Sequence, residues 1–305
     1  MEISGDGQTA TIVGVGGGLR GYSAAGVAIL DGYGPDEMCS GGRGQILMPW
    51  PNRVAGGRYR FGGHDYQLDL TEPARGNAIH GLTRWAEWDL EPTGPATATA
   101  RHRLAPRPSY PFRLGCQADY SLGPDGLTVR LSITNLGATA APVAIGMHPY
   151  LTVGTSSIDA ASIEVPAATT LVNDDAGIPV GSRPVAGTAV DFSTSRPIGP
   201  VRLDTAYTDL IRDPDGRARL RLGAAPGDDA DVEPGAGRQV VLWVDETFRY
   251  LQIFTGDTLP EPVRRRGVAV EPMTAPANAL RSGVGLTALE PGATYSGSWG
   301  IDPRG

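Results

Sequence analysis

The stretch GLTVRLSITN at residues 126–135 decides the class of fold that the sequence predicts. From Leu127 to Ile133 every odd position is apolar, and the even positions between them hold threonine, arginine and serine. Side chains of a β-strand point alternately to its two faces, so this pattern gives one apolar face and one polar face. We therefore expect a strand here that buries one face in the core.

Glycine and proline punctuate the rest of the chain and leave little room for helices. The 305 residues include 43 glycines and 26 prolines, and only residues 201–213 and 238–255 form long stretches without either. Within a helix, a glycine costs about 1 kcal/mol and a proline about 3 kcal/mol. Gly62-Gly63 has the form of a two-residue hairpin turn, and a second turn signal at Asp213–Gly216 separates two strand-like segments. The sequence thus predicts an all-β protein of many short antiparallel strands.

The chain shows no repeat of fixed period and no clear domain boundary. The best candidate for a linker is residues 223–237 (GAAPGDDADVEPGAG). Because this segment lies between two strand-like segments, we expect an acidic surface loop there. A chain of this length buries about three-quarters of its unfolded surface, which a single core provides. We expect residues 1–305 to form one large β-sandwich domain.

The charges and cysteines exclude several classes of function. A net charge of −7 disfavours nucleic acid and anionic membrane surfaces as partners. All 26 basic residues are arginine, so lysine Schiff-base chemistry and P-loop lysines are absent. Cys39 and Cys116 form at most one disulfide, and neither a signal peptide nor a membrane-spanning run is recognisable. We therefore expect a cytoplasmic protein.

Three glycines near the N-terminus have the spacing of a dinucleotide-binding loop. Gly16, Gly18 and Gly21 match G-x-G-x-x-G, a motif that needs a strand before it and a helix after it. Further glycines within residues 26–34 leave no place for that helix. We therefore expect these glycines to form bends and to bind no nucleotide.

Two of the four histidines lie in settings that suit function. His64 lies in a predicted hairpin and His102 in a polar strand, and both are expected to face solvent. His80 lies in a loop-like segment and His148 follows an apolar strand, so each is either an interior histidine or a catalytic one. No His-x-x-x-His or Glu-x-x-His spacing is present, so the sequence predicts no metal site.

Glu271 is the most distinctive carboxylate. The apolar run Val268–Val270 leads into it and Pro272 follows, so we expect an acid at the end of a buried strand. Such an acid is either held by structural hydrogen bonds or kept for proton transfer, and burial raises its pKa towards neutrality. The run Arg264–Arg266 is expected at a solvated edge.

Taken together, these segments resemble the aldose 1-epimerase family, the galactose mutarotases, along nearly the whole chain. The motifs that carry the resemblance are, in order, Pro49–Arg53, Asn77–Gly81, Met147–Leu151, Leu203-Asp204, Gln252–Gly256 and Val270–Pro272 followed by Pro276–Ala279. The resemblance implies a large antiparallel β-sandwich with a sugar cleft on one concave sheet.

The resemblance also implies roles for individual residues. Glu271 would be the general base, His148 the general acid, and His80 would assist at the ring oxygen. The residues implied to bind the sugar are Asn52, Arg53, Asp204 and Gln252. The aromatic rings of Trp50, Trp85 and Tyr150 are candidate walls for the apolar face of the sugar, by their chemistry alone.

The chain departs from the family pattern around the second histidine. Met147 stands where many members have asparagine, and Tyr150–Thr152 stand in place of a Phe-Asn pair. The acid stays in place, but the preference between glucose-type and galactose-type sugars is left open. Asp209 remains an alternative to Asp204 as the central acid.

The expected function is interconversion of the α and β anomers of a free aldohexose by acid/base ring opening and reclosure. This chemistry requires His148 and Glu271 to face each other across one pyranose, with no cofactor and no metal. The expected partner is a monosaccharide, bound by a monomer or homodimer. The alternatives are a hexose-6-phosphate 1-epimerase, which needs an arginine cluster, and a sugar-binding protein without turnover. A retaining glycosidase needs two carboxylates about 5–5.5 Å apart, and the sequence marks no such pair.

Overall fold

The computed structural model describes residues 1–224 and 238–304. Within these residues the helices are α1 (Ala279–Ser282) and two 3₁₀ turns, η1 (Pro73–Arg75) and η2 (Ile158–Ala160); the regular structure is otherwise β-strand. The predicted acidic loop, apart from its first two residues, lies outside the described residues. None of the described helices has the length and apolar character needed to cross a membrane.

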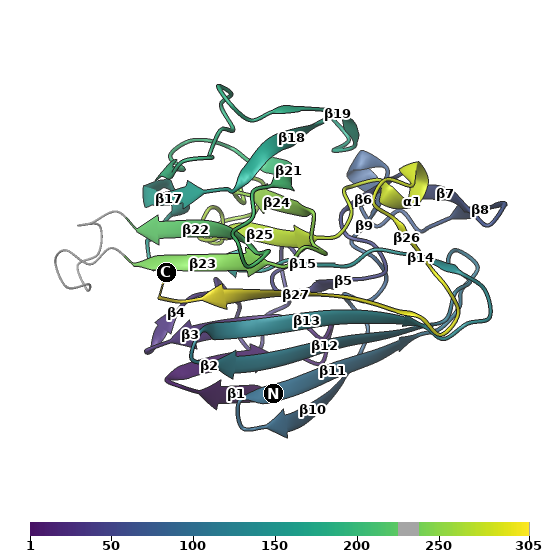
Figure 1. The fold of residues 1–305 in the computed structure, drawn as a ribbon, viewed down its shortest axis with the longest axis horizontal. Coiled ribbons are helices and arrows are strands. Elements are labelled where there is room, and N and C mark those ends of the chain that lie inside the picture. The colour runs from purple at the N-terminus through teal and green to yellow at the C-terminus, as the bar shows by residue number, and fades with distance from the viewer. Residues whose placement is uncertain (225–237, 305) are drawn as a thin grey trace.

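A nine-stranded antiparallel sheet forms one layer of the fold (Figure 1). Its strands in spatial order are β10 (Asp89–Gly94), β11 (Thr97–Leu104), β12 (Leu114–Gly123), β13 (Gly126–Asn135), β27 (Thr294–Asp302), β23 (Gln239–Val244), β22 (Ala218–Ala224), β17 (Ala161–Glu164) and β20 (Arg196–Pro197). In Figure 1 the long strands β11, β12, β13 and β27 lie side by side across the lower part of the view.

An eight-stranded antiparallel sheet forms the second layer, and its upper strands β18, β21 and β24 lie above that group in Figure 1. Its strands in spatial order are β19 (Pro179–Pro184), β18 (Ala167–Asn173), β21 (Asp204–Leu210), β24 (Tyr250–Phe254), β25 (Val268–Met273), β15 (Gly146–Met147) and β5 (Ile46–Leu47), with β16 (Tyr150–Leu151) also paired to β25. Buried side chains of both sheets belong to one continuous core. The all-β antiparallel sandwich is thereby confirmed.

Smaller antiparallel pairs complete the fold. They are the sheet β1 (Glu2–Gly5), β2 (Gln8–Ile12), β3 (Leu19–Ala24) and β4 (Val27–Ala28), and the pairs β6 (Arg53–Ala55) with β9 (Asn77–Ile79), β7 (Arg58–Phe61) with β8 (His64–Gln67), and β14 (Ala141–Val143) with β26 (Thr287–Leu289). Figure 1 shows β6, β9 and α1 together, beyond one end of β25. This placement matters because β6 and β9 supply one wall of the candidate site.

Residues Gly126–Asn135 form β13, as predicted. Its odd positions from Leu127 to Ile133 are fully buried, while Arg130 points to solvent. Burial of a leucine or isoleucine side chain stabilises the fold by about 1.5–3 kcal/mol. The hydrophobic alternation therefore fixes which face of the nine-stranded sheet packs on the core.

Both predicted turns are present: Gly62-Gly63 closes a hairpin, whereas Asp213–Gly216 lies between strands of different sheets. Gly62 and Gly63 join β7 to β8 with φ of 58° and 85°, left-handed values that glycine adopts without steric cost. The segment Asp213–Gly216 connects β21 to β22. The glycines at positions 16–21 precede or lie within β3, and the next described element is β4, so this segment forms bends and strand.

Three local expectations need correction or comment. His64 is exposed as expected, but His102 is half-buried, because its Nδ1 lies 2.9 Å from the carbonyl oxygen of Glu87. The arginine run is not simply solvated: Arg265 pairs with Asp159 and Asp257, and Arg266 pairs with Asp31, because the fold brings these carboxylates to it from distant segments. Both cysteines are free thiols.

Candidate active site

A cleft of about 470 Å³ lies between the face of the eight-stranded sheet and the β6–β9 pair. Its floor holds His80, His148 and Glu271, and its walls include Arg53 and Asp204. All three floor residues are buried, although they come from segments almost two hundred positions apart. The structure therefore gathers the three proposed catalytic residues in one place.

Strand register places the sheet side of the cleft. Asp204 on β21 pairs with Phe254 on β24, and Gln252, two residues earlier on β24, pairs with Glu271 on β25. Paired residues in an antiparallel sheet point to the same face, as do residues two apart on one strand. These four side chains therefore share one face. Val270, one residue from Glu271, points instead into the core.

The opposite side of the cleft is built by the junctions at β6 and β9. Asn52 and His80 both have left-handed backbone conformations, with φ of 55° and 63°. The His80 N–H donates to the Asn52 carbonyl oxygen at 3.0 Å, and the Asn52 N–H donates to His80 Nδ1 at 3.2 Å. This reciprocal pair fixes the imidazole against the chain that carries Arg53.

The central feature of the cleft is the direct contact between His148 and Glu271. His148 Nε2 lies 3.2 Å from Glu271 Oε1, and the two side chains are only 6% and 3% exposed. His148 Nδ1 and Glu271 Oε2 are buried and have no hydrogen-bond partner among the described residues. Unsatisfied buried polar atoms are costly, so they point to groups that a ligand completes.

Burial sets the protonation of this pair. It lowers the pKa of His148 to about 3, and the nearby Arg43 guanidinium acts in the same direction. It raises the pKa of Glu271 well above its usual value; the Asp204 carboxylate adds to this rise, and the Arg53 guanidinium opposes it. These opposite shifts favour the neutral forms of both groups, an unprotonated imidazole and a protonated carboxyl.

His80 is held as a neutral imidazole. Burial, with the neighbouring His148 and Arg84 adding to it, lowers the pKa of His80 well below its usual value. Because Nδ1 of His80 accepts the Asn52 N–H, its one ring proton is assigned to Nε2. His80 therefore has an N–H to donate to an acceptor, such as a ring oxygen.

The three floor residues also form the one set among the described residues whose spacing suits a metal. Ligand atoms of His80, His148 and Glu271 lie within 4.8 Å of one another, a convergence that sequence spacing did not indicate. A histidine bound to metal through Nε2 normally donates its Nδ1 proton to an acceptor. Here His80 Nδ1 meets an N–H donor and His148 Nδ1 meets no partner. The hydrogen bonding of this donor set therefore does not fit a metal.

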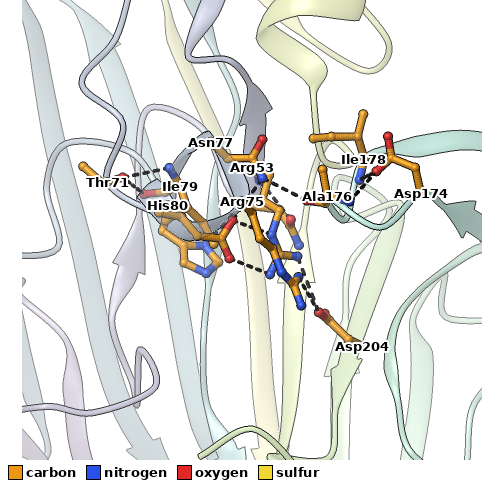
Figure 2. A network of polar contacts seen from close by, with 12 residues as sticks. Arg53, Thr71, Arg75, Asn77, Ile79, His80, Asp174, Ala176, Ile178 and Asp204 are labelled. Atoms are coloured by element: carbon orange, nitrogen blue, oxygen red, sulfur yellow. Dashed lines mark hydrogen bonds and ion pairs between the residues drawn. The ribbon is translucent and has the colours of Figure 1, made fainter.

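Arg53 is held by two carboxylates at the wall of the cleft. It forms a bidentate pair with Glu72, at 2.9 and 3.1 Å, and lies 3.5 Å from Asp204 (Figure 2). Arg75 also approaches Asp204, at 3.7 Å. Sequence analysis missed Glu72 and Arg75. Glu72 directly precedes the η1 turn and Arg75 ends it, just before the first histidine motif.

The hairpin tip between β18 and β19 contacts this network. Asn77 donates to the carbonyl oxygen of Ala176 at 2.9 Å, and Asp174 accepts the N–H of Ala176 and of Ile178 (Figure 2). Gly177 in this tip has φ of 77°, and a Cβ there would lie 2.9 Å from Arg53 Nη1. The glycine therefore gives the guanidinium its space.

The aromatic and cationic rim of the cleft is formed by Trp85, Phe254 and Arg84. Trp85 is 48% exposed, and the Arg84 guanidinium lies 5.7 Å from the centre of its ring. Trp85 is thus placed as expected for a wall on which a sugar stacks. Sequence analysis missed Phe254 and Arg84.

Three of the predicted substrate-binding residues do not line the cleft. Trp50 is a core side chain that packs 6.3 Å from Tyr110, and Tyr150 is buried behind His148, because the sheets close over both rings. Gln252 is 2% exposed and donates to Asp204 at 2.6 Å, so it orients the carboxylate that faces the cleft.

The alternative acid Asp209 does not line the cleft. It is exposed near the end of β21, five positions after Asp204, and its φ of 52° breaks the regular alternation of the strand.

The expected arrangement of acid and base across a pyranose is wrong. Their 3.2 Å contact leaves no room for a ring between them, because His148 lies between β15 and β16, which both pair with β25, the strand that carries Glu271. The pair instead approaches a ligand from one side. Two oxygens bonded to the same carbon match that arrangement.

Comparisons with known proteins identify the family of this chain. Residues 2–301 match the family model described as aldose 1-epimerase. The Escherichia coli K12 protein YihR is 33% identical over 287 residues, which is 94% of this chain and 87% of YihR.

Solved structures share the fold at low sequence identity. The GalM/aldose epimerase homologue of C. elegans superposes with a TM-score of 0.83 at 17% identity, covering 100% of this chain and 99% of that one. Galactose 1-epimerase of Lactobacillus acidophilus gives 0.81 at 19% identity, covering 100% and 94%. The family match over nearly the whole length, the YihR identity and the shared fold lead to one conclusion: the chain belongs to the aldose 1-epimerase family.

Proposed function

We propose that the protein is an aldose 1-epimerase that interconverts the α and β anomers of a free aldohexose. The observation that carries the proposal is the buried contact of His148 Nε2 with Glu271 Oε1 at 3.2 Å, on the floor of an open cleft. A pair that shares one proton has both functions that ring opening needs, a base for one oxygen and an acid for the other.

The proposed chemistry begins with the shared proton on His148. Hydroxyl groups of a bound sugar donate to Glu271, including its unpartnered Oε2, and so favour the ionised carboxylate. Glu271 takes the proton of the C1 hydroxyl while His148 gives its proton to the ring oxygen, and the C1–ring oxygen bond breaks. His80 donates a hydrogen bond from Nε2 to the same oxygen.

Ring closure reverses these transfers on the other face of the aldehyde. Rotation about C1–C2 presents that face, Glu271 returns its proton to the C1 oxygen, and His148 recovers its own. The pair ends with the one proton it began with, so no cofactor is consumed. Positioned proton transfer contributes about 10²–10⁴-fold, and orientation by Arg53 and Asp204 adds to it.

The proposal is tested by polarimetry of freshly dissolved α-glucose and α-galactose. The wild-type protein is expected to speed the approach to the anomeric equilibrium, and Glu271→Gln to lose about 10²–10⁴-fold in kcat. Glu164→Gln is the matched control, since it changes a carboxylate that pairs with Arg221 on the other sheet. No acceleration by the wild-type protein, or near-normal turnover by Glu271→Gln, would sink the proposal; binding without turnover would identify a sugar-binding protein instead.

A hexose-6-phosphate 1-epimerase is the second candidate, and Arg84 is the observation that favours it. Arg84 lines the cleft, and no carboxylate of the described residues lies within ion-pair distance of it. Burial lowers the pKa of Arg84, so an anionic group beside it would stabilise the charged guanidinium. In the same polarimeter, a large preference for 6-phosphates that Arg84→Gln abolishes would select this candidate. Equal rates on free sugars in both proteins would reject it.

A further inference from the structure

A column of three stacked groups lies behind the proposed acid. The Tyr150 ring stacks on the His148 imidazole with ring centres 5.2 Å apart and planes within 10°. On Tyr150 lies the Arg43 guanidinium, 4.4 Å from the ring centre. Both Arg43 and Tyr150 are almost completely buried, and neither lines the cleft.

Ion pairs and hydrogen bonds hold the Arg43 end of the column in place. Arg43 Nε and Nη2 donate to Asp31 Oδ2 at 3.2 and 3.0 Å, and Nη1 donates to the Ser40 carbonyl oxygen at 3.1 Å. Asp31 also pairs with Arg266. Buried charges persist only when they are paired, so this cluster holds the guanidinium in one place.

Two glycines close the column against the imidazole. Gly41 accepts the Tyr150 hydroxyl at 2.8 Å through its carbonyl oxygen. A Cβ on Gly42 would lie 2.9 Å from His148 Cδ2, and its φ of 77° favours glycine. The imidazole is thus packed by the Gly42 backbone and stacked on Tyr150.

We infer that Arg43 and Tyr150 are positioning residues, which hold the His148 ring in the plane that reaches Glu271 and set how readily it takes a proton. This inference rests on the proposed function for its catalytic meaning. Tyr150 supplies the plane, because an offset-stacked ring resists rotation of its neighbour. Arg43 supplies a fixed positive charge that disfavours a second cation in the column.

The other charged and titratable groups near His148 are distinct from this column. Glu271 faces it from β25, His80 from the end of β9, Arg53 from β6 and Arg84 from the loop after His80. None of them is replaced when Arg43 is changed. Asp31 keeps Arg266 as its partner, so the substitution leaves no unpaired buried carboxylate.

The effect of removing the Arg43 charge follows from distance. The two spacings bound the separation of guanidinium and imidazole at about 9.6 Å. Removing the Arg43 charge raises the pH at which the pair gains or loses a proton. Coulomb's law with an effective dielectric constant of about 20 gives a rise of about 1 pH unit in the Arg43→Met protein. Both limbs of the pH–kcat profile are expected to move to higher pH, with KM changed less than about threefold.

The Tyr150 variants separate stacking from hydrogen bonding. Tyr150→Phe keeps the ring and loses only the bond to Gly41, so kcat is expected to stay within several-fold of wild type. Tyr150→Leu frees the imidazole, and a displacement of about 1 Å costs about 10²-fold in kcat. Arg219→Met is the matched control. Arg219 is on β22, pairs with two carboxylates and does not line the cleft.

The outcomes separate this inference from the proposed function. Suppose that the wild type is active, that both limbs of the pH–kcat profile are unchanged in Arg43→Met, and that Tyr150→Leu is fully active. This result overturns the inference and leaves the proposed function unaffected. An inactive wild type overturns the proposed function; the column is then tested by ¹⁵N NMR of the His148 ring, which should gain its proton at a pH about 1 higher in Arg43→Met. If Arg43→Met does not fold, as judged by circular dichroism, Arg43→Gln takes its place.

Discussion

Replacing Glu271 with glutamine is expected to remove a loss of stability that the wild-type protein shows as pH rises towards the raised pKa of this buried carboxyl. Burial raises the pKa of Glu271 well above its usual value, whereas in the unfolded chain the carboxyl is ordinary, at about 4.3. Between these two values the folded protein binds a proton that the unfolded chain has released. The free energy of unfolding therefore falls as pH rises through this window.

The size of the pH effect on stability depends on the one proton of Glu271 and on two histidines whose titration has the opposite effect. A single proton changes the free energy of unfolding by about 1.4 kcal/mol per pH unit. Burial lowers the pKa of His148 to about 3 and that of His80 well below its usual value, so both add stability as pH rises to about 6.5. Above that pH both imidazoles are neutral in both states. The slope of Glu271 then stands alone, up to its folded pKa.

The assay is urea unfolding at half-unit steps from about pH 6.5 to about pH 8, on wild type and Glu271→Gln. The difference between the two proteins is expected to change by about 1.4 kcal/mol per pH unit until the folded pKa of Glu271 is reached, in favour of glutamine at the higher pH. Glu164→Gln should follow the wild type. Parallel curves for wild type and Glu271→Gln would refute the reasoning, because they would show that the buried carboxyl binds no extra proton in the fold.

Three further predictions concern the cleft wall and the core. Gly177→Ala should raise KM several-fold by displacing Arg53, relative to Gly187→Ala, which has the same backbone strain and an open side. Both variants should lose about 1–2 kcal/mol of stability relative to wild type; equal KM values in the two variants would contradict this. Trp85→Ala should raise KM with little change in kcat, whereas Trp85→Phe should restore KM; a fall in kcat alone would be the wrong result. Ile133→Ala should lose about 2–5 kcal/mol in urea unfolding, and a loss below about 1 kcal/mol would show that this face is not core.

Local sequence carried most of the information about the strands. The alternation from Leu127 to Ile133 identified a strand and its buried face, because a period of two depends only on neighbours along the chain. The glycine pair at Gly62-Gly63 identified a hairpin for the same local reason. The motifs around His80, His148 and Glu271 identified the residues of the floor, but they gave no distances between them.

The errors arose where contacts join distant segments. Trp50 and Tyr150 have rings that suit sugar stacking, yet whether a ring faces a cleft or the core depends on the sheets that close over it. Arg265 has ion-pair partners on other segments that the run of arginines does not reveal. Glu72 was missed because its partner Arg53 lies nineteen residues away and carries no motif that points to it.

The sequence by itself determined that the chain forms antiparallel strands, and it marked the imidazole and carboxylate that the proposed chemistry uses. Only the tertiary structure decided that these two groups touch, that they hold one proton between them, and that Tyr150 and Arg43 stand behind the imidazole. The physical reason is that alternation is a property of one strand, whereas proton sharing needs burial and a separation near 3 Å, which arise when strands far apart in the chain take their register in one sheet.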